Sequence, residues 1–361
     1  MVAQFHALNQ VRGRTILLRV TSALTLLAAA IGIATEPAGA QQKVTLRVAD
    51  SLPIGHIIID TATKPWIELV RKLSGGAIEV QYFPAEQLGK AKDFLQLTQS
   101  GLVDVGYVGP SYIADKMPLS AVAELPGAAA SSCQVMNAYW KLAKDGGFLY
   151  EHEFKPNRIR PLFVNAMPPY QAVLGASANV ASLGGLAGKK LRASGGAQDL
   201  TLRKFGIVPV RMAPPEIYEA LSRGTIDGTV LAFVSVESYK LTDIVKSATL
   251  GQNFGTVVTT YSISDARWQR LPNEVQAALT KAGDEIIRSS CTKFDRQEAS
   301  AAGRLEAAGV KLIRFDKADQ ARLDAASDEV AAEWAKTLDQ RGKPGSAALQ
   351  AFRAALAEAP R

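Results

Sequence analysis

Residues 185–228 read GLAGKKLRASGGAQDLTLRKFGIVPVRMAPPEIYEALSRGTIDG. A short strand of apolar and basic residues is expected to end at Arg192, directly before a pair of glycines. A helix follows and ends at Gly224, because glycine readily adopts the left-handed conformation that terminates helices. The guanidinium of Arg192 offers a planar pair of donors that matches a carboxylate and stays charged. We therefore expect Arg192 to bind the carboxylate of a small solute. The alternatives are a surface arginine and an ion pair with Glu216 or Asp227.

The chain before this stretch alternates strands with helices. Strand patterns lie at residues 44–50 and 78–82, a helical pattern lies between them at residues 57–73, and a third strand starts at Val103. This order predicts an α/β lobe with a largely parallel sheet, whose ligands bind outside the carboxyl ends of the strands. The candidate ligand-binding residues at those ends are Ser51, His56, Pro110 and Tyr112.

A second lobe is expected after the strand pattern at residues 161–167, where two prolines interrupt it. Tyr170 and Gln171 lie at this crossing, where they either hydrogen-bond the solute or pack the hinge. Phe233 begins a helical pattern that runs to Lys246. It either stacks on the solute or belongs to the core. His56 has a similar pair of interpretations, since its loop either faces the cleft or is solvated.

The domain organisation follows from these breaks. The first lobe is expected to comprise residues 41–165 together with returning segments between about 255 and 315. The second lobe spans residues 166–254, a long helix at residues 272–308 bridges the two, and residues 316–361 form C-terminal helices.

The first 40 residues are predicted to be a cleaved secretory signal peptide. Arginines precede an apolar run at residues 23–34, and Ala38-Gly39-Ala40 is a small-x-small cleavage site. The run is about 12 residues long, whereas a membrane-spanning helix needs roughly 20. No cysteine follows the run, which argues against a lipoprotein anchor. We expect an exported protein that is not itself embedded in a membrane.

A short pattern occurs once in each expected lobe. Residues 94–104 and 218–227 both read as a helix closed by glycine, followed by a short strand that ends at an aspartate. Asp104 and Asp227 resemble paired catalytic carboxylates only in sequence. Because one lies in each lobe, we expect both to have structural roles in turns.

The remaining residues argue against several classes of function. The sequence contains no GxSxG motif of hydrolases, no P-loop and no GxGxxG motif after a strand, so neither catalysis nor a cofactor is expected. The histidines show no metal-ligand spacing. The formal net charge of +7 fits an anionic ligand, but the basic residues are dispersed and show no nucleic-acid footprint. Cys133 and Cys291 form either a disulfide or two buried thiols.

Several ordered motifs resemble the solute receptors of tripartite ATP-independent periplasmic (TRAP) transporters, of the dicarboxylate-receptor (DctP) type. The similarity spans about residues 43–340. The motifs are GAIEV at 76–80, FPAEQLG at 83–89, QSGLVD at 99–104, ELP at 124–126, LAGKKLR at 186–192, PEIYEALSRGTIDG at 215–228 and WQRLPNEVQ at 268–276.

The resemblance implies a two-lobe, type II periplasmic-binding-protein fold that closes about a hinge onto an organic acid. It implies a periplasmic location, delivery of the acid to the membrane subunits of a TRAP permease, and a role for Arg192 in pairing with the solute carboxylate. An extracytoplasmic sensing module of the same fold is the alternative.

Three departures from the family pattern bear on the solute. Receptors for sialic-acid-like solutes have a second arginine near the position of Tyr170, an acidic residue where Gly109 stands and an asparagine where Leu231 stands. The less polar pocket implied here favours a monocarboxylate with an apolar or aromatic body.

Overall fold

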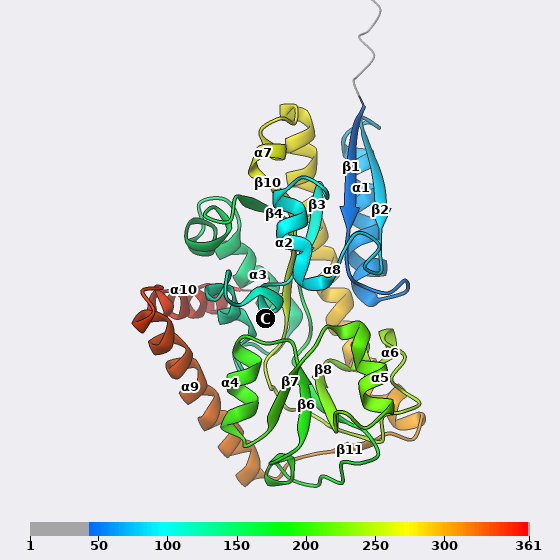
Figure 1. The fold of residues 1–361 in the computed structure, drawn as a ribbon, viewed down its shortest axis with the longest axis vertical. Helices are drawn as coiled ribbons and strands as arrows, with labels where there is room; N and C mark the ends of the chain where they lie inside the picture. The colour runs from blue at the N-terminus through cyan, green and yellow to red at the C-terminus, as the bar shows by residue number, and fades with distance from the viewer. Residues whose placement is uncertain (1–42, 360–361) are drawn as a thin grey trace, which may run out of the picture. The chain divides into compact units, whose positions relative to one another are not determined.

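The structure is a computed structural model and describes residues 43–359. The predicted signal peptide at residues 1–40 lies outside the described residues. The described part is a single compact unit that contains two β-sheets (Figure 1). None of its helices combines the length and apolar character needed to cross a bilayer.

The first lobe is built on a five-stranded sheet of order β2-β1-β3-β10-β4. Strand β1 pairs in parallel with β2 and β3, whereas β10 lies antiparallel between β3 and β4. The strands are β1 (Val44–Ala49), β2 (Ile78–Phe83), β3 (Val105–Val108), β4 (Ile159–Ala166) and β10 (Val258–Ser264).

Aromatic side chains form the core of this lobe. Trp66 lies on α1 (Lys64–Leu73), and its ring packs 5.1 Å from that of Phe163. Phe163 stacks in turn on Tyr261 of β10, with 4.6 Å between ring centroids. The other helices of the lobe are α2 (Phe94–Gln99) and α3 (Ser132–Ala143).

The second lobe is built on a six-stranded sheet of order β11-β9-β5-β8-β6-β7. Its central strands β5 and β8 are antiparallel, whereas β8, β6 and β7 run parallel. The strands are β5 (Gln171–Leu174), β6 (Lys190–Ala193), β7 (Val208–Arg211), β8 (Gly228–Leu231), β9 (Ser247–Thr249) and β11 (Lys311–Ile313). Its short helices are α4 (Ala197–Lys204), α5 (Ile217–Ser222) and α6 (Phe233–Ser238).

One predicted segment lies in the other lobe. The strand near residues 310–315 was expected to return to the first sheet, but β11 pairs in parallel with β9 at the edge of the second. The reason is the length of α8 (Asn273–Ala307), whose 35 residues extend the chain by about 52 Å. The helix therefore delivers the chain past the first lobe before β11 forms. The segments that do return to the first lobe are β10, α7 (Asp265–Trp268) and part of α8.

Helix α8 contacts both lobes (Figure 1). It packs against α1, α3 and β4 of the first lobe and against α6 and β11 of the second. A disulfide joins Cys133 of α3 to Cys291 of α8, which decides between the two alternatives left open by the sequence. The last two helices, α9 (Lys317–Gln340) and α10 (Gly345–Glu358), pack against α4 and α3, respectively.

Replacing both cysteines by serine is expected to lower the free energy of unfolding by about 2–5 kcal/mol, since a cross-link over a long loop restricts the unfolded chain. The two cysteines are separated by 158 residues. Urea denaturation with and without reductant measures the effect. Reductant should lower the midpoint of the wild-type protein to that of the double variant and leave the variant unchanged. A wild-type midpoint that reductant does not move would contradict the expectation.

The two lobes are joined by a pair of crossing segments that bond to each other. The first links β4 to β5, and the second links β9 to β10. Met167 N–H donates to the carbonyl of Val257 at 3.1 Å, and Tyr170 N–H donates to that of Gly255 at 2.8 Å. This short antiparallel pairing forms the hinge and places Tyr170 between the lobes.

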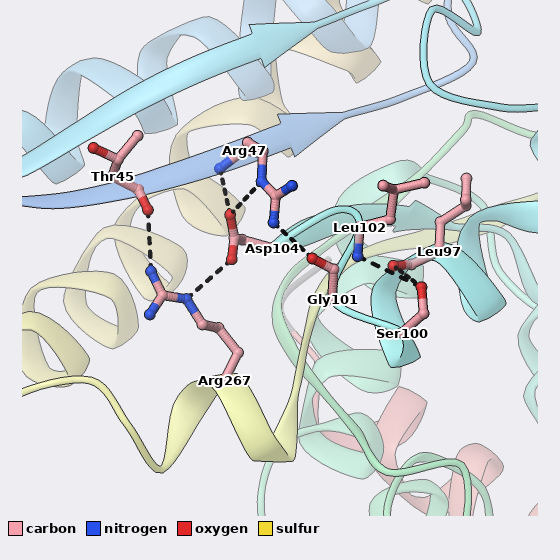
Figure 2. A network of polar contacts seen from close by, with 8 residues as sticks. All are labelled: Thr45, Arg47, Leu97, Ser100, Gly101, Leu102, Asp104 and Arg267. Carbon is pink, nitrogen blue, oxygen red and sulfur yellow. Dashed lines mark hydrogen bonds and ion pairs between the residues drawn. The ribbon is translucent and has the colours of Figure 1, made fainter.

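Asp104 fixes the start of β3 to its neighbours (Figure 2). Its carboxylate accepts the backbone N–H of Arg47 at 2.8 Å and the Nε–H of Arg47 at 3.1 Å. The Nε–H of Arg267 donates to the other carboxylate oxygen at 3.0 Å. The two guanidinium groups also donate to the carbonyls of Gly101 and Thr45.

Asp227 occupies the matching position in the second lobe. Its carboxylate accepts the backbone N–H of Lys190 at 2.8 Å, and its own N–H donates to the Lys190 carbonyl at 2.8 Å. Asp104 exchanges the same two bonds with Arg47. The preceding glycines, Gly101 and Gly224, have φ values of 75° and 68°. The structural roles predicted for both aspartates are confirmed.

Candidate functional site

A small cavity lies between the lobes beside the hinge. Its water-accessible volume is about 20 Å³, room for about one water molecule. The first-lobe residues that line it are His56, Ile58, Tyr107, Tyr112, Val257 and Thr259. The crossing segment and the second lobe contribute Met167, Tyr170, Pro214, Leu231, Ser235 and Tyr239. The lining is therefore mainly aromatic and apolar, with polar atoms at a few points.

Arg192 is buried next to this cavity, at the end of β6. Only 1% of its surface is exposed, and its Nε–H donates to the carbonyl of Met212 at 3.0 Å. Its Nη2 is buried and has no hydrogen-bond partner among the described residues. No described carboxylate forms an ion pair with it, so the alternative of a structural ion pair with Glu216 or Asp227 is not realised. A buried cation with an unused donor is suited to an anionic ligand.

Three tyrosines are close enough to Arg192 for its charge to act on them. Burial raises the pKa of Tyr112, Tyr170 and Tyr239, and the positive charge of Arg192 opposes that rise in each case. All three tyrosines also line the cavity. They therefore connect Arg192 to the apolar space, as expected of residues that hold the body of an organic acid.

Gly109 makes room for one of these tyrosines. A Cβ atom at this position would lie 2.6 Å from Cδ2 of Tyr112. An acidic side chain, which the family pattern has here, is therefore incompatible with the observed position of the ring. The glycine at position 109 therefore allows the Tyr112 ring to line the cavity. Leu231 adds an apolar side chain to the lining, at the position where receptors for sialic-acid-like solutes are expected to have asparagine.

A larger groove lies near Arg192. Its volume is about 670 Å³, and both lobes line it. Tyr112, Ser194 and Met212 are among its lining residues, and the Met212 carbonyl accepts the Nε–H of Arg192. Lys90 and Arg211 also line it, and each is paired with a carboxylate. Arg192 itself is not among the lining residues.

His56 lies in the first-lobe wall of the cavity, as predicted. Its side chain is buried, and its ring packs 4.9 Å from that of Tyr239 in the second lobe. Nδ1 accepts the backbone N–H of Ile58 at 3.2 Å. Burial lowers the pKa of His56 to about 3, so the ring is neutral at physiological pH.

Besides Arg192, four predicted site residues do not line the cavity. Gln171 is held within the second lobe, since its amide donates to the carbonyl of Gln252 and accepts from Thr249. Its part is therefore to pack the hinge, the second of the two roles considered. Phe233 belongs to the core, because the first turn of α6 directs it inward. Ser51 and Pro110 are buried in the first lobe.

Sequence reasoning missed several residues of the cavity. Tyr107 is the last residue but one of β3, so its position in the sequence pointed to the carboxyl end of this strand. Val257 and Thr259 reach the same edge because β10 runs antiparallel to β3. Tyr239 was expected inside a helix over residues 233–246, but α6 ends at Ser238, and Tyr239 turns toward His56.

Glu124 is a buried carboxyl group at the lobe interface. One oxygen accepts the N–H of Val258 at 3.2 Å, and the other has no partner among the described residues. That second oxygen lies 3.7 Å from the position of a Cβ on Gly196 in the second lobe. Burial raises the pKa of Glu124 to about 8. Among the described residues, no group of three metal-ligating side chains comes together.

The chain is similar to known solute-binding proteins over most of its length. The family model for bacterial extracellular solute-binding protein, family 7 (DctP), matches residues 48–337. The outer membrane transporter protein TsaT of Comamonas testosteroni is 23% identical over 334 residues, which cover 92% of this chain and 97% of TsaT.

Solved structures show the same fold. A marine-metagenome TRAP solute-binding protein specific for aromatic acid ligands, crystallised with 3-hydroxybenzoate, has a TM-score of 0.82 and 23% identity, covering 89% of this chain and 100% of its own. A TRAP periplasmic solute-binding protein from Bordetella bronchiseptica, with bound (R)- and (S)-mandelate, has a TM-score of 0.77 and 25% identity, covering 87% and 99%.

These similarities confirm the two-lobe fold predicted from the sequence. The matched family consists of receptors rather than catalysts, which agrees with the expectation that the chain is not an enzyme. Because the family model covers well over half of the chain, this protein belongs to bacterial extracellular solute-binding protein family 7, the DctP family of TRAP solute receptors.

Proposed function

We propose that this protein captures a monocarboxylate with an aromatic or apolar body in the periplasm and delivers it to a TRAP permease. The observation that carries the proposal is the buried Nη2 of Arg192, which has no partner among the described residues and lies beside an aromatic cavity. Guanidinium pairs well with a carboxylate, and the tyrosines and Leu231 suit an apolar body. Relatives of the same fold bind 3-hydroxybenzoate and mandelate.

Binding requires the lobes or the lining side chains to move. The cavity volume of about 20 Å³ is smaller than any aromatic acid, whereas the adjoining groove is open. A solute that contacts both lobes stabilises the closed arrangement, and rotation about the hinge admits and releases it. The crossing segments at Met167 and Tyr170 are where this rotation is expected.

A thermal-shift screen over aliphatic, keto and aromatic acids tests the proposal. Aromatic monocarboxylates such as benzoate and mandelate should raise the melting temperature by several degrees, because a ligand at about 100 times its Kd adds about 2.7 kcal/mol of stability. Succinate and sialic acid serve as controls and should produce smaller shifts. A clear preference for either control would contradict the proposed solute class. Delivery is measured separately, as uptake into vesicles that contain the permease, with and without this protein.

A further inference from the structure

We infer that the solute carries a hydroxyl or keto oxygen on its body, away from the carboxylate, and that His56 selects this oxygen by donating a hydrogen bond from Nε2. The inference rests on the proposed function, since it assumes that a carboxylate occupies the Arg192 end of the site. It adds a requirement on the solute that the arginine does not impose.

The hydrogen bond at the other ring nitrogen determines where the proton lies. Nδ1 of His56 accepts the backbone N–H of Ile58 at 3.2 Å, so its lone pair is occupied. A neutral imidazole carries one proton, and with Nδ1 acting as acceptor the proton must be on Nε2. Burial keeps the ring neutral, with a pKa of about 3. His56 therefore presents a donor, and only a donor, at Nε2.

His56 lines the cavity and is 2% exposed. Its bond to the Ile58 N–H uses Nδ1, and no hydrogen bond from Nε2 to another described residue is present. Thr259, 1% exposed, lines the same cavity, and its Oγ1 is buried without a partner among the described residues. A buried polar atom without a partner carries a cost that a ligand oxygen would remove. The Oγ1 of Thr259 together with the donor of His56 makes this end of the cavity suitable for a hydroxyl group.

The polar end at His56 is separate from the carboxylate end. The charge of Arg192 affects the pKa of Tyr112, Tyr170 and Tyr239, whereas the charge that acts on His56 is that of Asp60. The three tyrosines line the cavity together with His56, whereas Arg192 does not line it.

This arrangement fits an acid whose ring or side chain lies among the tyrosines. Its carboxylate would point toward Arg192 and its second oxygen toward His56.

Two substitutions at His56 separate the two ring nitrogens. In His56→Asn, the amide oxygen takes the place of Nδ1 and can still accept the Ile58 N–H, but the donor at Nε2 is lost. In His56→Gln, the amide nitrogen reaches the place of Nε2 and keeps a donor there. His152→Asn is the matched control, because this exposed histidine lies outside the cavity and bonds its own helix at the Phe148 carbonyl.

Calorimetry with two pairs of acids provides the measurement: benzoate with 3-hydroxybenzoate, and phenylacetate with 3-hydroxyphenylacetate. The wild-type protein and His152→Asn should prefer the oxygen-bearing member of at least one pair by roughly tenfold or more, since a site built around a hydrogen bond discriminates against a ligand that lacks it. His56→Asn should reduce that preference to within about threefold, mainly by weakening the oxygen-bearing acid. His56→Gln should retain part of it.

The outcomes distinguish this inference from the proposed function. Equal binding of both members of each pair by the wild-type protein would overturn the role of His56 while leaving the carboxylate site intact. A preference that survives in His56→Asn would overturn it as well. If none of the four acids binds, the proposed function fails, and the inference that rests on it fails too.

Discussion

Replacing Arg192 by glutamine is expected to weaken solute binding by roughly 30- to 5,000-fold. Loss of one partner from a buried, hydrogen-bonded charge pair costs about 2–5 kcal/mol, and each 1.4 kcal/mol corresponds to a factor of ten. Arg192 meets the conditions for this range, because its side chain is buried and its Nη2 has no other partner among the described residues. The affinity of Arg192→Lys should lie between those of the wild-type protein and Arg192→Gln, since lysine keeps the charge and loses the planar pair of donors.

Stability separates this effect from misfolding. Without solute, the positive charge of Arg192 is buried and forms no ion pair with a described carboxylate. Arg192→Gln should therefore melt at the same temperature as the wild-type protein or a higher one. Arg203→Gln, an exposed change on α4 of the same lobe, controls for net charge and should bind normally. Calorimetry that shows unchanged affinity for Arg192→Gln would falsify the carboxylate site.

The second large effect is a loss of stability as the pH rises, centred on Glu124. Burial raises the pKa of this carboxyl group from 4.5 to about 8. Between these two values the folded protein holds a proton that the unfolded chain has released, so the free energy of unfolding falls as pH increases. One pKa unit corresponds to about 1.4 kcal/mol, so the contribution over the whole interval is on the order of 5 kcal/mol.

Three buried carboxyl groups contribute to the change between pH 6.5 and 8. Burial raises the pKa of Glu153 and Glu298 to about 7, so both act in the same direction as Glu124, and each adds roughly half as much over this interval. His56, with a pKa lowered to about 3, opposes the trend only below its unfolded value of 6.5. Glu124 alone should lower the free energy of unfolding by about 2 kcal/mol between pH 6.5 and 8.

Urea denaturation at the two pH values measures the slope. Glu124→Gln should remove about half of it, because glutamine has no proton to lose while Glu153 and Glu298 still titrate. Glu219→Gln, an exposed change on α5, should leave it unchanged. The role assigned to Glu124 is wrong if its glutamine variant shows the wild-type slope.

The sequence located candidate residues at strand ends better than it located the other residues of the cavity wall. Arg192 was singled out because its strand ends near glycines and because the family resemblance implies an arginine at this position. His56 and Tyr112 were identifiable because they follow the carboxyl ends of strands in the first lobe. The arguments from strand ends use only local order along the chain, which alternation of strands and helices reveals.

The missed residues depend on how distant segments meet. Thr259 lines the cavity because β10 inserts antiparallel between β3 and β4, a sheet order that no local pattern encodes. Tyr239 was missed because α6 ends at Ser238, and the helical pattern after it gave no sign of this. The role of Gln171 stayed open in the sequence because an amide beside a hinge serves equally well to bind a ligand or to bond its own sheet. Only the position of Gln252 decides between these roles.

The disulfide has a mechanical consequence for α8. Cys291 fastens the middle of this helix to α3 in the first lobe, while Glu298 on the same helix accepts the N–H groups of Phe233 and Val234 in the second. The two attachments lie two turns apart, about 10 Å along the axis. The cross-link therefore holds the helix against the first lobe as far as Cys291. We expect any bending of α8 that accompanies rotation of the second lobe to occur in the part of the helix after Cys291.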